Sequence, residues 1–345
     1  MIKVLLGMSG GVDSSAAALL LKEKGYEVTG CTLILFDENG ESKANAKNAK
    51  AVCDKLGIEH ITLDLSADFK EKVMDYFVSE YLKGRTPNPC IACNINIKFG
   101  AMLDFALENG FTHIATGHYA KIVSQDGHFN LYRADDLNKD QSYVLYHLTD
   151  EDLSHIIFPL CDLTKAEIRE LADRAGLVTA NKPDSQEICF IPDNDHIGFL
   201  ERNSESLPPR GNFVDFDNNI LGEHLGIHRY TVGQRKGLGI TFGKPMFVCD
   251  IDPVTNNIVL GEKGTEFKSE FYIENISVAY GTDTKKAVDG QIKIRYSAKP
   301  QEATVEFLED NLAKVTLKNP ARAVTSGQAA VLYDGEKVLL GGIIR

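Results

Sequence analysis

The stretch Gly7-Met8-Ser9-Gly10-Gly11-Val12-Asp13-Ser14-Ser15 decides how the first part of this chain folds. It lies between the apolar run 2–6, which is typical of a buried strand, and the segment 14–24, which is typical of an amphipathic helix. Glycines let the backbone approach an anion closely, and the amides of a turn that leads into a helix point at it. The stretch therefore predicts a phosphate-binding turn. It is not a Walker loop, because no Gly-Lys-Ser/Thr follows.

Strand-like and helix-like segments alternate after this turn. Such alternation predicts an α/β domain with a Rossmann-like parallel sheet that helices cover on both faces. Ligands of such sheets bind at the carboxyl ends of the strands. Further strands are expected at 28–36, 61–65 and 113–116, and helices at 44–56, 68–82 and 99–108.

The sequence pattern changes after Asn203. Pro208, Pro209 and Gly211 are typical of turns and loops, and beyond them short strand-like segments replace the long helical ones. Alternating apolar residues from about Phe271 onward predict a small antiparallel β-barrel. We expect three domains: an α/β domain with the phosphate-binding turn at 1–204, a small linking domain at 205–270, and a C-terminal β-barrel at 271–345.

Composition and charge restrict the function. The 345 residues carry 37 basic and 49 acidic side chains, and the net charge of -12 argues against a generally basic nucleic-acid binder. A local basic face is still compatible with residues 205–345, which hold 17 basic and 18 acidic side chains. Neither a signal peptide nor a membrane span is expected. Seven cysteines are too few for a disulfide scaffold and favour a reducing, cytoplasmic location.

A second motif, GRTPNPCIACN at 84–94, places two cysteines after a proline-restricted loop. A thiol near the start of a helix has a lowered pKa, which makes Cys93 a candidate nucleophile. The pair Cys90 and Cys93 could instead be half of a zinc site, a dithiol redox pair or ligands of an iron–sulfur cluster. A complete four-cysteine zinc site is disfavoured because no second Cys-x-x-Cys exists.

A third motif is DSQEICFI at 184–191, which contains Cys189. Taken alone, a cysteine between Ile188 and Phe190 is more often a core residue than a catalyst. The remaining cysteines stand in apolar runs and are expected in the core: Cys31, Cys53, Cys161 and Cys249.

In combination, the motifs resemble the bacterial tRNA-specific 2-thiouridylase family of the PP-loop ATP pyrophosphatase superfamily. The resemblance runs in order through the whole chain. It covers the glycine turn, the two cysteine motifs, ATGHYA at 115–120, KDQSY at 139–143, HRYTVGQRKGLG at 228–239 and SGQAAVLY at 326–333.

The resemblance implies a set of site residues. Cys93 is the family's catalytic thiol and Cys189 carries the persulfide. The ATP site comprises Gly7, Met8, Ser9, Gly10, Gly11, Val12, Asp13, Ser14, Leu33 and Gly117, and Asp13 is expected to hold Mg²⁺ through ATP. The target base and the rest of the tRNA are expected to contact Asn88, Pro89, Cys90, His118, Lys139, Asp140, Gln141, Arg295, Tyr296 and Gln328.

The implied reaction is a sulfur transfer to tRNA. ATP adenylylates O2 of the wobble uridine in the anticodon loop, persulfide sulfur on Cys189 replaces the activated oxygen, and a Cys93–Cys189 disulfide remains. A sulfur-carrier protein or a cysteine desulfurase is the expected donor. Many family members have Asp where this chain has Cys90, and a thiol cannot replace a carboxylate as a base of similar pKa. The same difference adds a third thiol to Cys93 and Cys189, and the three cysteines Cys90, Cys93 and Cys189 could hold a [4Fe–4S] cluster.

Other readings remain open at this stage. His118 could act as a general base or as a positioning donor. A PP-loop ligase or amidotransferase that adenylylates a small metabolite would explain the glycine turn, and an RNA-binding module with a degenerate nucleotide fold is a non-enzymatic alternative. Candidate contacts to the RNA backbone are Lys139, Arg229, Arg235, Lys236 and Arg295, and candidate stacking rings are Tyr143, Tyr230 and Tyr296.

Overall fold

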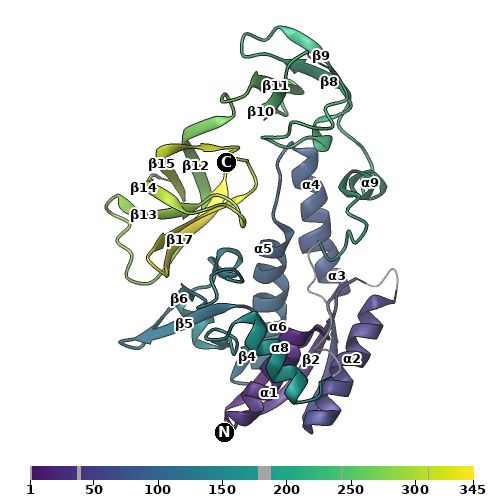
Figure 1. Ribbon diagram of the computed structural model, residues 1–345, viewed down its shortest axis with the longest axis vertical. Helices are drawn as coiled ribbons and strands as arrows, with labels where there is room; N and C mark the ends of the chain where they lie inside the picture. Colours follow the sequence, from purple (N-terminus) through teal and green to yellow (C-terminus); the bar gives the residue numbers. More distant parts are fainter. Residues whose placement is uncertain (1, 37–39, 178–187, 242, 310) are drawn as a thin grey trace.

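A computed structural model describes residues 2–36, 40–177, 188–241, 243–309 and 311–345. Figure 1 shows an N-terminal α/β part, a small β-sheet at the opposite end and a β-barrel beside the helix that connects them. Of the motif at 184–191, residues 184–187 lie outside the described part of the chain.

The N-terminal sheet has five parallel strands in the order β3-β2-β1-β4-β7. Alternate residues of β1 face opposite layers, because Val4 and Leu6 pack with the first helix whereas Leu5 packs on the other side. The predicted parallel sheet is confirmed. The strands are β1 (Lys3–Gly7), β2 (Glu27–Ile34), β3 (Glu59–Asp64), β4 (His113–Ala115) and β7 (Ile156–Ile157).

Helices cover both faces of this sheet. The layer with Val4 and Leu6 contains α1 (Val12–Glu23), α2 (Glu41–Leu56) and α8 (Lys165–Arg174). The other layer contains the helical run α5 (Pro89–Cys93), η2 (Asn94–Ala101) and α6 (Met102–Glu108). A second continuous helical run extends beyond the sheet and consists of α3 (Ser66–Phe69), η1 (Lys70–Asp75) and α4 (Tyr76–Leu82). The other described helices are short: η3 (Ser142–Val144), α7 (Asp150–Ser154), α9 (His196–Arg202) and η4 (Ile227–Arg229).

The helix expected at 99–108 begins ten residues earlier than predicted, at Pro89. Pro89 stands at the first helical position, where its missing N–H costs nothing, and the Asn88 side chain accepts a hydrogen bond from the Cys90 amide at 3.0 Å. The middle of the run, Asn94–Ala101, is π-helical. Both motif cysteines therefore lie on a helix.

The same run, Pro89–Glu108, is the one described helix long and apolar enough by length and composition to cross a membrane, and half of that stretch is buried inside the protein. A core helix of a folded domain passes the same test.

The small middle sheet has the strand order β10-β11-β8-β9. Its core gathers Phe213, Ile227, Tyr230 and Val248. The strands are β8 (Gly211–Val214), β9 (Ile220–His224), β10 (Met246–Asp252) and β11 (Asn257–Glu262).

The C-terminal part is a six-stranded antiparallel barrel, which confirms the predicted class. Pairing of the first strand with the last closes it. The first strand begins at Phe267, so the division expected at 270/271 falls inside it. The strands are β12 (Phe267–Val278), β13 (Val288–Lys293), β14 (Gln301–Phe307), β15 (Leu312–Arg322), β16 (Ala329–Asp334) and β17 (Lys337–Ile344).

A hairpin that the sequence analysis did not predict joins the first and last parts of the chain. Strands β5 (Ala120–Gln125) and β6 (His128–Arg133) leave the N-terminal domain, and β6 pairs with β17 where Tyr132 faces Lys337. Tyr143 and Tyr333 are fully buried at this junction. The barrel is thus anchored to the sheet that carries the glycine turn.

Candidate active site

The glycine turn lies where β1 ends and α1 begins. Gly10 has a φ of 67°, and a Cβ atom there would lie 2.7 Å from the carbonyl oxygen of Asn45. The Ser14 hydroxyl accepts from the Ser9 amide at 3.3 Å and donates to the Gly11 carbonyl at 3.2 Å. The turn is therefore closely packed against the α2 region at the carboxyl end of the sheet.

Asp13 has partners that the sequence analysis missed. The Lys165 ammonium group donates to its two carboxylate oxygens at 2.7 and 2.8 Å, and the Tyr119 hydroxyl donates at 2.7 Å. Lys165 begins α8, and the Thr164 capping box fixes that end of the helix. A cation beside a candidate phosphate-binding turn suits nucleotide binding. In the sequence, only the position of Lys165 directly after the helix cap Thr164 could have indicated this role.

The next strand end completes this edge of the sheet. A Cβ atom on Gly117 would lie 3.1 Å from the Ser14 amide nitrogen, so the turn and the end of β4 touch. Leu33, near the end of β2, packs in the apolar layers beside the sheet. Gly7, Leu33 and Gly117 thus lie at the carboxyl ends of neighbouring parallel strands.

His118 is buried and neutral. Burial lowers its pKa well below the usual value, and the charge of Lys98 lowers it further. Since Lys98 can only donate, its Nζ at 3.4 Å makes Nε2 of His118 the acceptor, and Nδ1 then donates to the Thr116 hydroxyl at 2.7 Å. This geometry favours the positioning role over the general base.

The two motif cysteines and Cys189 gather at one place. Cys93 is 8% exposed and shares its apolar cluster with Phe190 and Ile191, the residues that follow Cys189. Cys90 and Cys189 are exposed at the surface. All seven cysteines are free thiols.

Burial acts against the expected reactivity of these thiols. Burial raises the pKa of Cys93, and the charge of Cys90 raises it further. The positive charge of Lys98 offsets part of this increase. Solvent reaches Cys189, but protein atoms crowd its sulfur. Desolvation is the main cause that raises the pKa of this thiol to about 12, and the charges of Cys93 and Cys90 contribute to the increase. The lowered pKa expected for Cys93 is wrong, because the residue sits one turn into the helix among apolar side chains.

Lys98 connects the two halves of the site. It lies about one turn along the helix from Cys93, touches His118 at the strand end, and its charge acts on both Cys93 and Cys189. Through Gly117 and Lys98, the glycine turn and the thiols therefore belong to one continuous region.

Three domains meet at the loop before the cysteines. The Thr86 amide donates to the Ser326 carbonyl at 2.8 Å, and the Gln328 side chain donates to the Thr86 carbonyl at 2.7 Å. The Thr86 hydroxyl also reaches Thr231 of the middle domain at 3.3 Å. Gln328 thus holds this loop in place in the structure, and its expected role in tRNA contact stays a prediction.

Hydrogen bonds to neighbouring parts of the same domain fix the segment 139–141. Asp140 is buried and accepts from Ser142 and from the Ala134 amide, and Gln141 accepts from the Tyr119 amide at 3.0 Å. Lys139 is half-buried beside them. Asp140 and Gln141 therefore shape the loop that presents Lys139.

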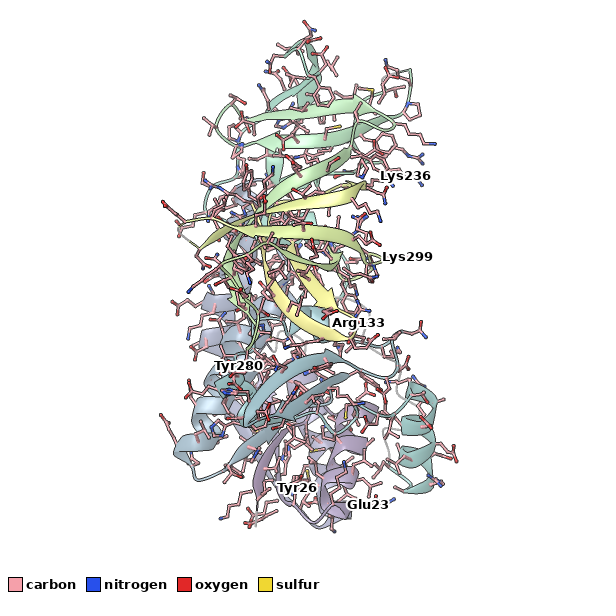
Figure 2. All side chains as sticks on the ribbon, turned by 90° about the vertical axis from the view of Figure 1, so that its left-hand side faces the viewer. Glu23, Tyr26, Arg133, Lys236, Tyr280 and Lys299 are labelled. Carbon is pink, nitrogen blue, oxygen red and sulfur yellow. The ribbon has the colours of Figure 1, made fainter. Side chains whose placement is uncertain are left out.

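Of the other expected RNA contacts, some face solvent and some do not. Arg295, Tyr296, Arg235 and Lys236 are exposed. Arg229 is bound to Glu201, and Tyr143 and Tyr230 are buried in cores, so none of these three presents itself to a ligand. Figure 2 shows Lys236 and Lys299 along the same edge of the molecule.

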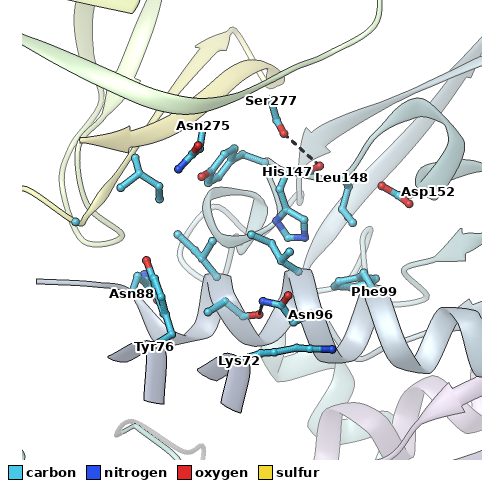
Figure 3. A pocket seen from close by; sticks show the side chains of 16 residues that line it. Lys72, Tyr76, Asn88, Asn96, Phe99, His147, Leu148, Asp152, Asn275 and Ser277 are labelled. Carbon is cyan, nitrogen blue, oxygen red and sulfur yellow. Dashed lines mark hydrogen bonds between the residues drawn. The ribbon is translucent and has the colours of Figure 1, made fainter. Parts of the chain in front are cut away.

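A cavity of about 480 Å³ lies between the helical run and the barrel (Figure 3). Ile91, Ala92 and Asn96 line it, whereas Cys90 and Cys93 do not, so the thiols lie on another face of the helix. His147 also lines it, and neither of its ring nitrogens has a hydrogen-bond partner among the described residues. Asn88 reaches this cavity from the start of the helix.

In this structure Lys165 binds the carboxylate of Asp13, which was expected to hold Mg²⁺ through ATP. Within the described ranges, no three His, Cys, Asp or Glu side chains are arranged to bind a metal ion by themselves, and this includes the thiols Cys90, Cys93 and Cys189. The Mg²⁺ ion therefore stays a prediction, and the three thiols as placed do not fit an iron–sulfur cluster.

Family profiles cover nearly the whole chain. Residues 2–193 match the tRNA methyl transferase HUP domain, residues 197–262 the tRNA methyl transferase PRC-barrel domain, and residues 268–344 the aminomethyltransferase beta-barrel domain.

Curated relatives match over the same length. The tRNA-specific 2-thiouridylase MnmA 1 of Clostridium botulinum (strain Okra) is 47% identical over 99% of this chain and 98% of its own. The MnmA protein of Carboxydothermus hydrogenoformans is 48% identical over 99% and 97%. Among solved structures, a 4-thiouridine synthetase–RNA complex with bound ATP is 18% identical, with a TM-score of 0.36, over 58% of this chain and 50% of that one.

The parallel sheet, the glycine turn and the HUP-domain match define an ATP-using enzyme of the PP-loop class. Within that class, the chain belongs to the tRNA-specific 2-thiouridylase family, as the full-length identity to its members shows.

Proposed function

We propose that this enzyme uses ATP to replace the C2 oxygen of the wobble uridine of tRNA by sulfur. The observation that carries the proposal is the position of Lys98, which touches His118 at the strand end beside the glycine turn and acts electrostatically on Cys93 and Cys189. An activated nucleoside and a sulfur donor can then meet in one site.

The first step needs a cradle for the triphosphate. The amides of the glycine turn and the Lys165 ammonium group would hold the phosphates, while the uridine O2 attacks the α-phosphate. The bond between the α and β phosphates breaks, pyrophosphate leaves, and AMP stays on O2. Lys165 would exchange its Asp13 partner for phosphate oxygens as the nucleotide enters.

The second step moves sulfur. The terminal sulfur of a Cys189 persulfide attacks C2, and AMP leaves with the former O2. Cys93 then attacks the Cys189 sulfur, so that 2-thiouridine is released and a Cys93–Cys189 disulfide forms. The Lys98 charge favours the thiolate forms, which offsets part of the burial that raises both pKa values.

The RNA would lie along the side where Figure 2 shows Lys236 and Lys299. Arg295 and Lys299 line a hollow of about 410 Å³ on the barrel, a suitable place for backbone phosphates, whereas Arg322 at the same hollow is paired with Glu266. Tyr296 is exposed beside it and its ring suits stacking on an unpaired base. Lys139, Arg235 and Arg295 remain our candidates for phosphate contacts.

We further propose a catalytic domain at 1–204, a linking domain that ends before β12, and a barrel that begins with that strand at Phe267 rather than at 271. A protein persulfide, from a sulfur-carrier protein or a cysteine desulfurase, would load Cys189, which is exposed. The free state of all seven thiols suits the reducing cytoplasm.

The test combines two assays. Incubation with ATP, a tRNA transcript and a protein persulfide as sulfur donor should give 2-thiouridine at the wobble position, and tRNA should stimulate pyrophosphate release. Cys93→Ser and Cys189→Ser should abolish thiolation, whereas the matched control Cys161→Ser, whose thiol lies outside the cluster, should not. Full ATP-dependent turnover of a small metabolite by both serine variants would instead support a ligase.

A further inference from the structure

The motif cysteine that the proposed reaction leaves unused is Cys90. Cys90 and Cys93 stand three residues apart on one helix, where Cα atoms are about 5 Å apart. That separation falls within the range of about 4.4 to 6.8 Å that disulfides span. The charge of Cys90 also acts on Cys93, which places the two thiols near each other.

The two thiols differ in access. Cys93 is 8% exposed and packs among apolar side chains, whereas Cys90 is exposed. A disulfide between Cys93 and Cys189 would join the buried Cys93 sulfur to a sulfur that protein atoms crowd. A disulfide between Cys90 and Cys93 would join it to a thiol at the exposed start of the helix.

We infer that Cys90 is a resolving thiol that moves the disulfide left by sulfur transfer onto an accessible Cys90–Cys93 pair. This inference rests on the proposed function. Cys90 thiolate attacks the Cys93 sulfur, the Cys93–Cys189 bond breaks, and Cys189 leaves and takes a proton from water. An external dithiol then reduces the Cys90–Cys93 disulfide, becomes a disulfide itself and returns both cysteines to thiols.

The environment of Cys189 favours this direction. Its crowded sulfur is a neutral thiol near neutral pH, and a thiol does not attack a disulfide as a thiolate does. Once released, Cys189 does not attack the new pair and stays available for the next persulfide.

The test maps disulfides after one turnover. Persulfide-loaded enzyme reacts with ATP and a tRNA transcript without reductant, free thiols are blocked with acid quenching, and tryptic peptides are analysed by mass spectrometry. Peptide 86–98 contains both Cys90 and Cys93. We expect it two hydrogen atoms lighter and not cross-linked, with Cys189 blocked as a free thiol.

Cys90→Ser should give the cross-linked Cys93–Cys189 peptides instead. For this variant we measure the amount of product from the second turnover relative to that from the first. With a protein dithiol as reductant this ratio should be about tenfold lower than in the wild type, and with a small phosphine it should recover. The ratio is taken within each variant, so loss of a base contact does not change it. Cys161→Ser should behave as the wild type.

Two other results have distinct meanings. If wild-type enzyme makes 2-thiouridine and ends the turnover with a Cys93–Cys189 cross-link and a blocked Cys90, the resolving role is overturned and the proposed function stands. If it makes no 2-thiouridine with persulfide on Cys189, the proposed function fails, and the resolving role fails with it.

Discussion

The Lys165 ammonium group lies against both carboxylate oxygens of Asp13, at 2.7 and 2.8 Å, and closes the glycine turn with a positive charge. Lys165→Met should lower tRNA-dependent pyrophosphate release by about 10²-fold, the loss expected for one preorganised charge donor. Release measured over a range of ATP concentrations tests this.

The pair itself can be separated from the phosphate role. The double variant Asp13→Asn/Lys165→Met should lose less pyrophosphate-release activity than the product of the two single-variant losses, because each single variant already breaks the same contact. Fully additive losses would show that Asp13 and Lys165 act independently of each other.

Gly10→Ala should destabilise the turn. Its φ of 67° costs a side-chain-bearing residue about 1 to 2 kcal/mol, and the new Cβ would meet the Asn45 oxygen at 2.7 Å. Thermal unfolding should show a loss of at least that size. Gly11→Ala is the matched control, since Gly11 has a φ of -101° and its Cβ would meet only the Ser9 hydroxyl, at 3.3 Å; an equal loss there would contradict the argument.

Alkylation should distinguish the three thiols of the active site. At pH 8 a pKa of about 12 leaves only roughly 10⁻⁴ of Cys189 as thiolate, and Cys93 is buried with a raised pKa. Iodoacetamide should therefore modify Cys90 first, and modification of Cys189 should accelerate as the pH rises from 8 to 10. Equal rates at pH 8, measured by peptide mass spectrometry, would refute this order.

The stability should fall as the medium becomes acidic because of His147. Burial lowers its pKa from 6.5 to about 4, so the unfolded chain binds the proton more readily than the folded protein. Its contribution is complete above pH 6.5 and is lost as the pH falls toward 4, by up to about 3 kcal/mol at 1.36 kcal/mol per pKa unit. Urea unfolding between pH 7 and 4 measures the slope.

His147→Gln should flatten that slope, because glutamine does not titrate. Replacing Asn96, which lines the same cavity and does not titrate, provides the control and should leave the slope unchanged.

Local patterns predicted the elements that depend on short-range physics. The turn Gly7–Ser15 stands between a strand and a helix as expected, and the expected strands of the parallel sheet form within a few residues of their predicted ends. The start of the cysteine helix was misplaced because its cap, Asn88, and Pro89 were read as part of a loop. The hairpin β5–β6 was missed because its partner β17 is far away in the sequence.

The site was harder to predict where it depends on contacts between distant segments. The motifs indicated Cys93, Cys189 and the glycine turn. They did not indicate Lys165 or Lys98, since a lysine on a helix is ordinary unless one knows which strand end it reaches. Burial likewise reversed the expected pKa of Cys93.

The hairpin β5–β6 has a consequence for biosynthesis. Strand β6 emerges from the ribosome early, but the strand that covers its free edge, β17, is among the last residues to be translated. An uncovered edge strand readily pairs with other chains. The nascent protein must therefore pass through a long interval in which its N-terminal half is prone to aggregate, and chaperone protection matters most during that interval.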